Sequence, residues 1–200
     1  MGAEAFSFNS AFKGGADASC VHIDDIRAAR EATTYLIERG HRRITFYNDL
    51  LRDTGHCSVT ERLEGYTQAM REAGLSASIE SVVAEQDEYA DHLVKLGPGK
   101  RPTAVLGYDD IRVMDLMLEL WRRGMVFPRD LSLMGFNDEI SSKYTIPPLT
   151  TMGFPVAEVA DAGAQAMLRR IAGIGLNGKE MTTIPMTLIE RDSVGPLANG

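Results

Sequence analysis

Apolar positions along this chain follow two alternating patterns, one with helical spacing and one of short continuous runs. Helical spacing predicts a first helix that begins near Asp24 and ends at Gly40. It predicts four more helices, around Leu63 to Met70 and at 89–96, 110–123 and 155–171. Short apolar runs predict strands at 44–47, 81–84, 103–107, 131–135, 150–152, 182–185 and 187–190. The opening stretch, 1–20, shows neither pattern and is expected to be irregular.

Between Asp24 and Gly135, helices and strands alternate with short connections. Such alternation favours parallel strands joined by crossover helices, which cover both faces of the sheet. The sequence therefore predicts an α/β fold of three layers, a parallel sheet between two layers of helices.

Composition narrows the possible partners. The chain has 200 residues, a net charge of −7, 44% hydrophobic residues and 24% charged residues, as in ordinary globular proteins. Because binding to phosphates needs a basic surface, this charge argues against broad contact with nucleic acid or a membrane surface.

The two cysteines, Cys20 and Cys57, lie far apart and match no zinc-binding pattern, so no metal and no cofactor is expected. Two free thiols are typical of a reducing compartment, with a lone disulfide in an exported protein as the alternative. The start of the sequence lacks the features of a signal peptide, and no apolar run is long enough to span a membrane. These observations predict a cytoplasmic protein.

Polar side chains follow the carboxyl ends of four predicted strands, where ligands bind in open parallel sheets. In chain order they include Asn48, Asp49, Arg52 and Asp53, then Gln86, Asp87 and Tyr89, then Tyr108 and Asp109, then Asn137, Asp138 and Glu139. Arg62 follows the first group. Carboxylates and amides bind hydroxyl groups, an arginine donates in a fixed geometry, and an aromatic ring packs on the apolar face of a sugar or base. This edge is therefore a candidate site for a polyhydroxylated small molecule.

Alternative interpretations remain for several of these groups. Asp110 and Glu139 could simply cap helices. Asp109, Asp138 and Glu139 could act as an acid and a base or hold a cation, but no catalytic motif accompanies them. No catalytic residue is therefore assigned, and the protein is not expected to be an enzyme.

Five segments occur in an order that resembles a known family: "AAREATTYLIERGHRRITFY", "ERLEGYTQAMREAGL", "RPTAVLGYDD", "ELWRRGMVFPRDLSLMGFNDEISSKYTIPPLTTM" and "IPMTLIERDSV". The chain from about Val21 to Val194 resembles the effector-binding region of transcription regulators of the lactose-repressor/galactose-repressor (LacI/GalR) type. The resemblance implies a periplasmic-binding-protein-like fold of type I, mainly its carboxyl-terminal lobe. It also implies a small-molecule effector (a sugar or a nucleoside-like molecule), a homodimer, and contact with DNA only through a helix-turn-helix headpiece that has no counterpart here.

Position by position, the resemblance assigns ligand contacts to four residues, Asn137, Arg62, Tyr108 and Asp109. It also places Tyr89 near the position of an aromatic residue that lines the effector cleft in the family. Arg52 is added from the loop after the first strand, although that loop is longer than is typical. Asn137 stands where the family commonly has aspartate, and Tyr108 replaces another polar residue, so the resemblance specifies no particular sugar.

The same resemblance predicts four parts of the chain. They are an irregular start at 1–20, the carboxyl-terminal lobe at 21–149, a crossover segment and helix at 150–178 that would pack on a first lobe mostly absent here, and return strands and a tail at 179–200. The chain is thus expected to be a truncated product or a fragment. An exported sugar-binding protein that serves a transporter, with the same fold, is the alternative function.

Overall fold

The computed structural model describes residues 6–8, 19–49, 56–172 and 181–197. Its larger unit is a six-stranded sheet in the order β4-β3-β5-β6-β7-β9, in which β9 alone is antiparallel to its neighbour. The strands are β3 (Ile44–Asn48), β4 (Glu80–Val83), β5 (Ala104–Gly107), β6 (Ser132–Asn137), β7 (Thr150–Gly153) and β9 (Thr187–Ile189). The predicted α/β class with a mostly parallel sheet is confirmed.

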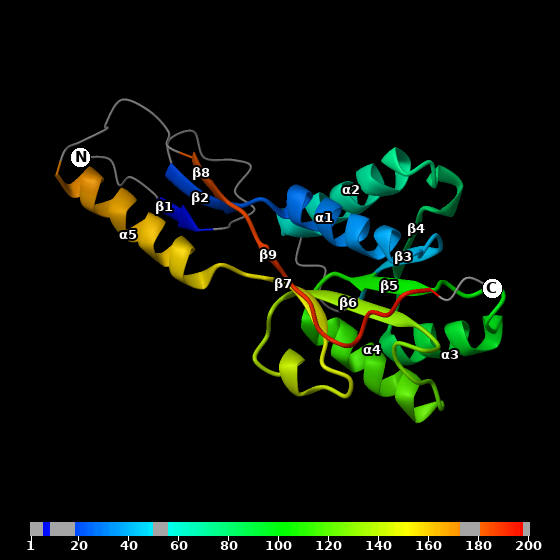
Figure 1. Cartoon of the computed structure of the whole chain (residues 1–200). Helices are drawn as coiled ribbons and strands as arrows, with labels where there is room; N and C mark the ends of the chain where they lie inside the picture. The colour runs from blue at the N-terminus through cyan, green and yellow to red at the C-terminus, as the bar shows by residue number, and fades with distance from the viewer. Residues whose placement is uncertain (1–5, 9–18, 50–55, 173–180, 198–200) are drawn as a thin grey trace.

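Helices cover both faces of this sheet (Figure 1). One face carries α1 (Asp25–Glu38) and α2 (Cys57–Glu72), and the other carries α3 (Gln86–Leu96) and α4 (Asp110–Arg122). Successive residues of one strand serve opposite cores, since Phe46 packs with α1 and α2 whereas Tyr47 packs with α3 and α4. The predicted three-layer arrangement is present.

The close approach of α1 and α2 depends on Gly65. A β-carbon at this position would lie 2.1 Å from the backbone oxygen of Ile26, so no larger residue fits without moving a helix. This approach brings Arg62 of α2 against Asp25, at the start of α1.

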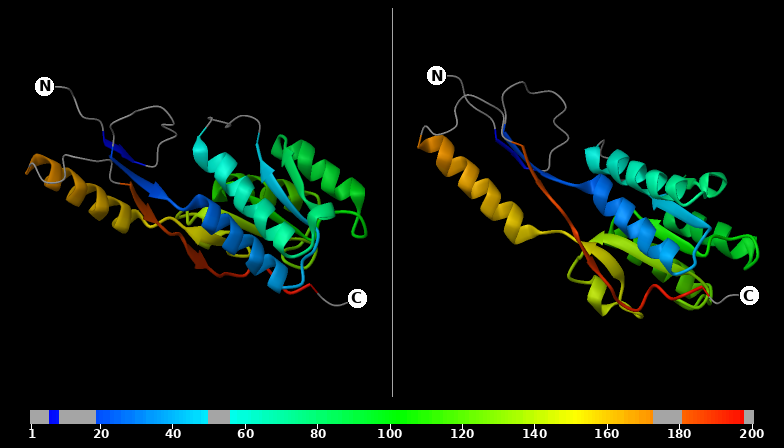
Figure 2. Two further views of the ribbon diagram at one scale, coloured as in Figure 1. Left: turned by 90° about the horizontal axis from the view of Figure 1, so that it is seen from above. Right: turned by 45° about the horizontal axis from the view of Figure 1, so that its top comes forward.

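A second, smaller sheet lies beside α5, at the end of the molecule far from α3 and α4 (Figure 2). It consists of β1 (Phe6–Phe8), β2 (Ser19–Ile23) and β8 (Met181–Ile184), all parallel, and α5 (Val156–Ile171) contacts all three strands. The chain passes between the two units at β2–α1, β7–α5 and β8–β9.

Two expectations about the ends of the chain are corrected. The stretch 1–20 is not wholly irregular, because it contains β1 and the start of β2. Residues 150–153 and 187–189 join the large sheet, whereas Val21 to Ile23 belong to the small one. The reason is pairing between segments that are distant in sequence, which short apolar runs cannot specify.

Candidate functional site

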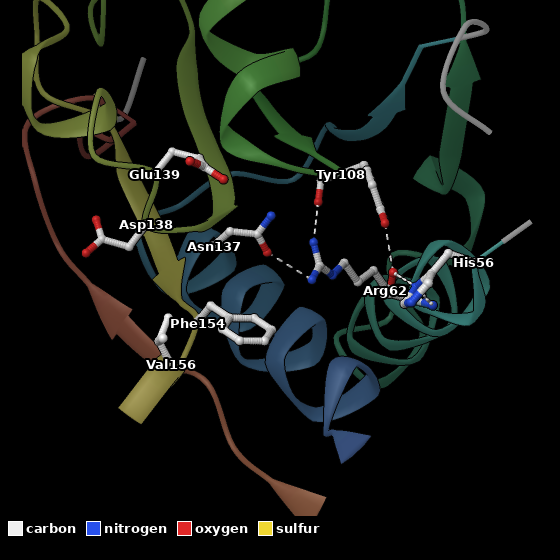
Figure 3. Close-up of a pocket in the computed structure, with 9 residues that line it drawn as sticks. His56, Arg62, Tyr108, Asn137, Asp138, Glu139, Phe154 and Val156 are labelled. Carbon is white, nitrogen blue, oxygen red and sulfur yellow. Dashed lines mark hydrogen bonds between the residues drawn. The ribbon is translucent and has the colours of Figure 1, made fainter. Parts of the chain in front are cut away.

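A pocket of about 520 Å³ opens where the carboxyl ends of β5, β6 and β7 meet the first turns of α2 (Figure 3). Its lining residues are His56, Ser58, Arg62, Tyr108, Asn137, Asp138, Glu139, Phe154 and Val156. The pocket therefore joins the large unit to the segment that leads into α5.

Arg62 is the polar centre of the pocket, although its side chain is only 3% exposed. Its Nε donates to Asp25 Oδ1 at 2.6 Å, Nη1 donates to the Tyr108 carbonyl at 2.6 Å, and Nη2 donates to Asn137 Oδ1 at 3.2 Å. The guanidinium carbon also lies 4.6 Å from the centre of the Phe136 ring. Asp25 compensates the buried charge, and the other contacts fix the direction of each N–H group.

Asn137 ends β6 in the left-handed region, with φ of 98°, and Asp138 follows with φ of 54°. Asn and Asp enter this region more readily than other side chains, which explains their presence at a turn this sharp. The carboxylate of Asp138 accepts a hydrogen bond from Arg191 Nη2 at 2.5 Å. The turn thus directs the Asn137 amide toward Arg62 and leaves Asp138 paired with a cation.

A buried carboxylate, that of Asp110, holds the same turn in place through hydrogen bonds. Asp110 Oδ2 accepts from the Glu139 backbone N–H at 2.8 Å, and Oδ1 accepts from Thr151 Oγ1 at 2.6 Å. Burial raises the pKa of Asp110 to about 7, despite these two bonds. Gly135 is required beside it, since a β-carbon there would lie 2.3 Å from Asp110 Oδ1.

Tyr108 closes another side of the pocket. Its hydroxyl lies 2.8 Å from Ser58 Oγ, which in turn lies 2.7 Å from His56 Nδ1. Its ring centre lies 5.0 Å from the guanidinium carbon of Arg62 and 4.8 Å from that of Arg112. Tyr108 therefore links the first turn of α2 to both arginines.

The predicted site residues divide into four groups, of which Tyr89 is the last. Arg62, Tyr108 and Asn137 are brought together in the pocket. Asp109 lies close by in sequence but caps α4, accepting from the Arg112 backbone N–H at 2.9 Å, and its carboxylate is paired with the Arg112 guanidinium. Arg52 lies outside the described residues.

Tyr89 is placed elsewhere, which corrects the expectation for this residue. It is 3% exposed in the core between the sheet and α3, and its ring stacks on Tyr47 with centroids 4.9 Å apart. Burial raises the pKa of its hydroxyl above the usual range. Its position near a strand end suggested a ligand contact, but the helical face that carries it points into the core.

The sequence interpretation missed several lining residues, namely His56, Ser58, Phe154 and Val156. Phe154 directly follows β7, so the rule applied to the other strand ends would have found it. His56 and Ser58 lie at the start of α2, where only the three-dimensional fold shows that they face the sheet edge.

The expected helix capping by acidic residues holds in part. Asp109, rather than Asp110, caps α4, and the Asp110 side chain instead holds the turn at Glu139. His41 is buried and bonded to Thr103 and to the Gly195 carbonyl, as expected of a structural histidine.

Comparison with known proteins gives consistent matches. Residues 33–194 match the family model described as periplasmic binding protein-like domain. The chain is 33% identical to the HTH-type transcriptional regulator GalR of Escherichia coli over 90% of this chain and 52% of that protein. It is 32% identical to a probable opine utilization operon repressor of Rhizobium rhizogenes over 89% of this chain and 94% of that protein.

Solved structures agree with these matches. A LacI transcriptional regulator from a Rhodococcus species superposes with a TM-score of 0.84 at 26% identity, covering 98% of this chain and 71% of that one. A LacI family regulator from Enterococcus faecium with bound ribose superposes with a TM-score of 0.80 at 22% identity, covering 92% and 68%. The chain spans about half the length of relatives such as GalR. Within the described residues, no helix is long and apolar enough to cross a membrane.

Proposed function

This chain belongs to the LacI/GalR group of periplasmic binding protein-like domains, and on that premise we propose that its pocket binds a small polyhydroxylated effector. The effector would be a sugar or a nucleoside-like molecule. Binding, rather than catalysis, would be the role of the site, since the relatives named above are regulators of transcription.

The convergence of Arg62, Asn137 and Tyr108 on one pocket is the observation that carries this proposal. The Arg62 guanidinium and the Asn137 amide together offer donors and an acceptor in fixed directions, which suits vicinal hydroxyl groups. Phe154 adds a ring that can pack on the apolar face of a sugar or base (Figure 3). A ring face next to directed polar groups is typical of sites that bind neutral, hydroxyl-rich molecules.

The place of the pocket suggests how binding would be transmitted. Arg62, Tyr108 and Asn137 belong to the large unit, whereas Phe154 directly follows β7 and Val156 is the first residue of α5. A ligand that contacts both would favour one arrangement of the two units over others. Effector binding and operator binding are then linked reciprocally through closure of the two lobes.

DNA contact is assigned to a helix-turn-helix headpiece outside these 200 residues, in agreement with the net charge of −7. Control of an operator by a homodimer, as in the family resemblance, completes the proposal. The ligand site itself needs neither the headpiece nor DNA.

Thermal unfolding in the presence of a panel of aldoses, polyols and nucleosides tests this proposal. At least one compound should raise the Tm of the wild-type chain, because a ligand that binds only the folded state stabilises it. Asn137→Gly removes the amide and tolerates the positive φ, so it should abolish the shift without straining the turn. Gln165→Ala, on the exposed side of α5, is the control and should keep the shift. An equal shift in Asn137→Gly would remove this pocket as the site.

A further inference from the structure

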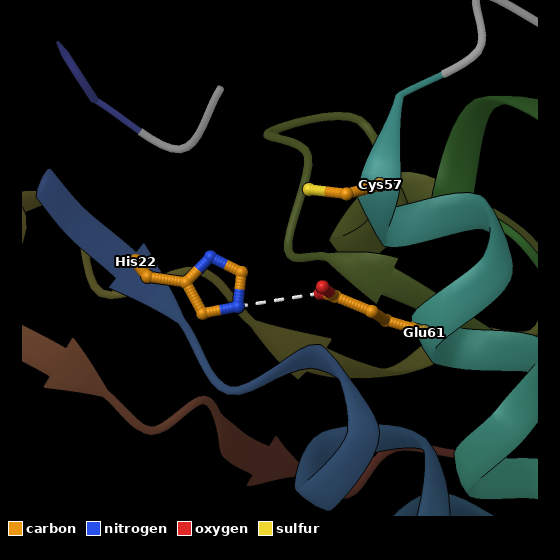
Figure 4. A group of neighbouring side chains, drawn as sticks. All are labelled: His22, Cys57 and Glu61. Atoms are coloured by element: carbon orange, nitrogen blue, oxygen red, sulfur yellow. Dashed lines mark ion pairs between the residues drawn. The ribbon is translucent and has the colours of Figure 1, made fainter. Parts of the chain in front are cut away.

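Three side chains outside the pocket lining converge between the two units: His22 of β2, and Cys57 and Glu61 of α2 (Figure 4). His22 Nε2 lies 3.3 Å from Glu61 Oε2, and the ligand atoms of all three residues lie within 4.8 Å of one another. Each of the three is partly buried rather than fully exposed. Imidazole nitrogen, thiolate sulfur and carboxylate oxygen are the donor atoms that zinc takes in proteins.

The backbone explains why these residues meet. Cys57 and Glu61 are four residues apart on α2, so their side chains lie on one face of the helix, one turn apart. Burial and the nearby carboxylates of Glu61 and Asp25 raise the pKa of the Cys57 thiol, so a metal ion that binds there would have to displace its proton. His22 reaches the same face from β2, a strand of the small sheet. Two ligands on one helical turn and a third from a separate element form a chelating arrangement.

The distances agree with tetrahedral coordination. Two ligands bound to zinc at about 2.0–2.1 Å are separated by about 3.3 Å across a tetrahedral edge, which is the separation of His22 Nε2 and Glu61 Oε2. Cys57 Sγ lies within 4.8 Å of the other two ligand atoms. To reach the shorter separation that zinc requires, the sulfur would move by about 1 Å, which a rotation of the side chain can supply. Three protein ligands leave the fourth position to water.

We propose that His22, Cys57 and Glu61 bind a divalent transition-metal ion, with Zn²⁺ as the ion that best matches this ligand set. The ion would join β2 of the small sheet to the first turn of α2. Since His56 and Ser58 flank Cys57 and line the pocket, the ion would also fix that edge of the pocket. This site could not be predicted from the sequence, because His22 and Cys57 are far apart and match no zinc spacing. The inference does not depend on the identity or existence of an effector.

Titration of the tag-free, chelator-treated and reduced 200-residue chain with Zn²⁺ tests the inference, with metal content measured after gel filtration. One zinc ion per chain is expected. Replacing a residue that only hydrogen-bonds to a metal ligand lowers metal affinity by about 10- to 100-fold. Cys57→Ser and His22→Gln replace ligands themselves, so each should lower the affinity by more than that. Glu61→Gln should weaken it as well.

Matched controls keep the test decisive. Glu64→Gln lies on the same helix with its side chain exposed, and His92→Gln replaces an exposed histidine of α3, so both should bind zinc as the wild type does. With Co²⁺ in place of zinc, the wild type should show a sulfur-to-cobalt charge-transfer band that Cys57→Ser lacks, while circular dichroism confirms that each variant is folded. Zinc uptake that persists unchanged in both Cys57→Ser and His22→Gln, or no stoichiometric uptake by the wild type, would overturn the inference.

Discussion

Two buried arginines, Arg62 and Arg112, both lie near the ring of Tyr108 but serve different purposes. Both side chains are nearly inaccessible, at 3% and 4% exposed. Arg112 is enclosed by two carboxylates, since it pairs with Asp109 and lies 3.4 Å from Asp49 Oδ2. Arg62 pairs with one carboxylate, Asp25, and donates from Nη1 to a carbonyl and from Nη2 to a neutral amide.

Of the two cations, Arg62 is the one that a ligand in the pocket can reach. Two carboxylates pair with Arg112, and one of them, Asp109, also caps the start of α4. The bond from Arg62 to Asn137 is a longer one, 3.2 Å, to an uncharged acceptor at the pocket wall. Rearranging it for a ligand therefore costs less than breaking a pair of charges.

The largest expected effect is on stability at the enclosed arginine. Arg112→Ala leaves Asp109 and Asp49 buried without this cation, and removing one partner of a buried ion pair costs about 3–5 kcal/mol. Urea unfolding should report this loss. Arg129→Ala, which removes an exposed partner of Asp130, serves as the control and should show no measurable change. If Arg112→Ala lowered the free energy of unfolding by less than about 1 kcal/mol, Arg112 would not have the stabilising role that distinguishes it from Arg62.

A pH dependence should come from Asp110, whose hydrogen-bond partners, unlike those of Asp25 and Asp109, are neutral groups. Its pKa is raised to about 7 from 3.8, so the folded protein holds a proton that the unfolded chain releases. Its contribution to stability is therefore complete below about pH 4 and is lost as the pH rises to about 7, by at most about 1.4 kcal/mol per pH unit.

Unfolding measured from acid to neutral pH in the wild type and in Asp110→Asn checks this. The amide in the variant does not titrate, and Thr151 can accept its N–H, so the variant should lack this slope. Parallel stability curves for the two proteins would contradict the assignment.

Substitution of the two arginines by lysine should have different effects on the affinity for the effector. Arg62→Lys keeps the charge beside Asp25 but cannot reach three partners in fixed directions. Loss of one hydrogen bond to a charged group, about 1.5–3 kcal/mol, corresponds to a fall in affinity of about 10- to 100-fold. Calorimetry with a ligand from the panel measures it. Arg112→Lys is the matched variant and should bind within about twofold of the wild type; an equal fall in both would remove the distinction.

The smallest expected effect concerns Tyr108, whose ring lies near both arginines. Tyr108→Phe keeps the ring near both guanidinium groups but removes the hydroxyl that bonds to Ser58. A neutral hydrogen bond contributes about 0.5–1.5 kcal/mol, so the free energy of unfolding should fall by that amount. Denaturant unfolding measures this change. A fall of more than about 3 kcal/mol in the free energy of unfolding would mean that the hydroxyl, rather than the ring, makes the main contribution of Tyr108.

The sequence predicted the large unit well because its strands and helices have strong local signals. Gly40, Gly74 and Gly124 follow α1, α2 and α4 with positive φ, as the helix ends required. The rule for strand ends placed Tyr108 and Asn137 at one edge of the sheet, and the structure joins them there with Arg62. The α/β class and the layers followed from the same local patterns.

What the sequence could not provide depends on contacts between distant segments. The small sheet pairs β2 with β8 across most of the chain, and the apolar run that predicted a strand at 182–185 does not show which strand it pairs with. Tyr89 was misplaced because its position near a strand end says nothing about which face of α3 carries it. Cys57 and His22 showed no relation until β2 and α2 were placed side by side.

Nuclear magnetic resonance of the arginine Nε–H groups, during titration with a ligand found in the panel, shows whether Arg62 or Arg112 responds to the ligand. Arg62→Lys and Arg112→Lys identify the two resonances, because each variant lacks one of them. The Arg62 signal should shift in proportion to ligand bound while the Arg112 signal stays in place, since only Arg62 lines the pocket. A shift of Arg112 with Arg62 unmoved, or no shift of either during saturable binding, would contradict the account.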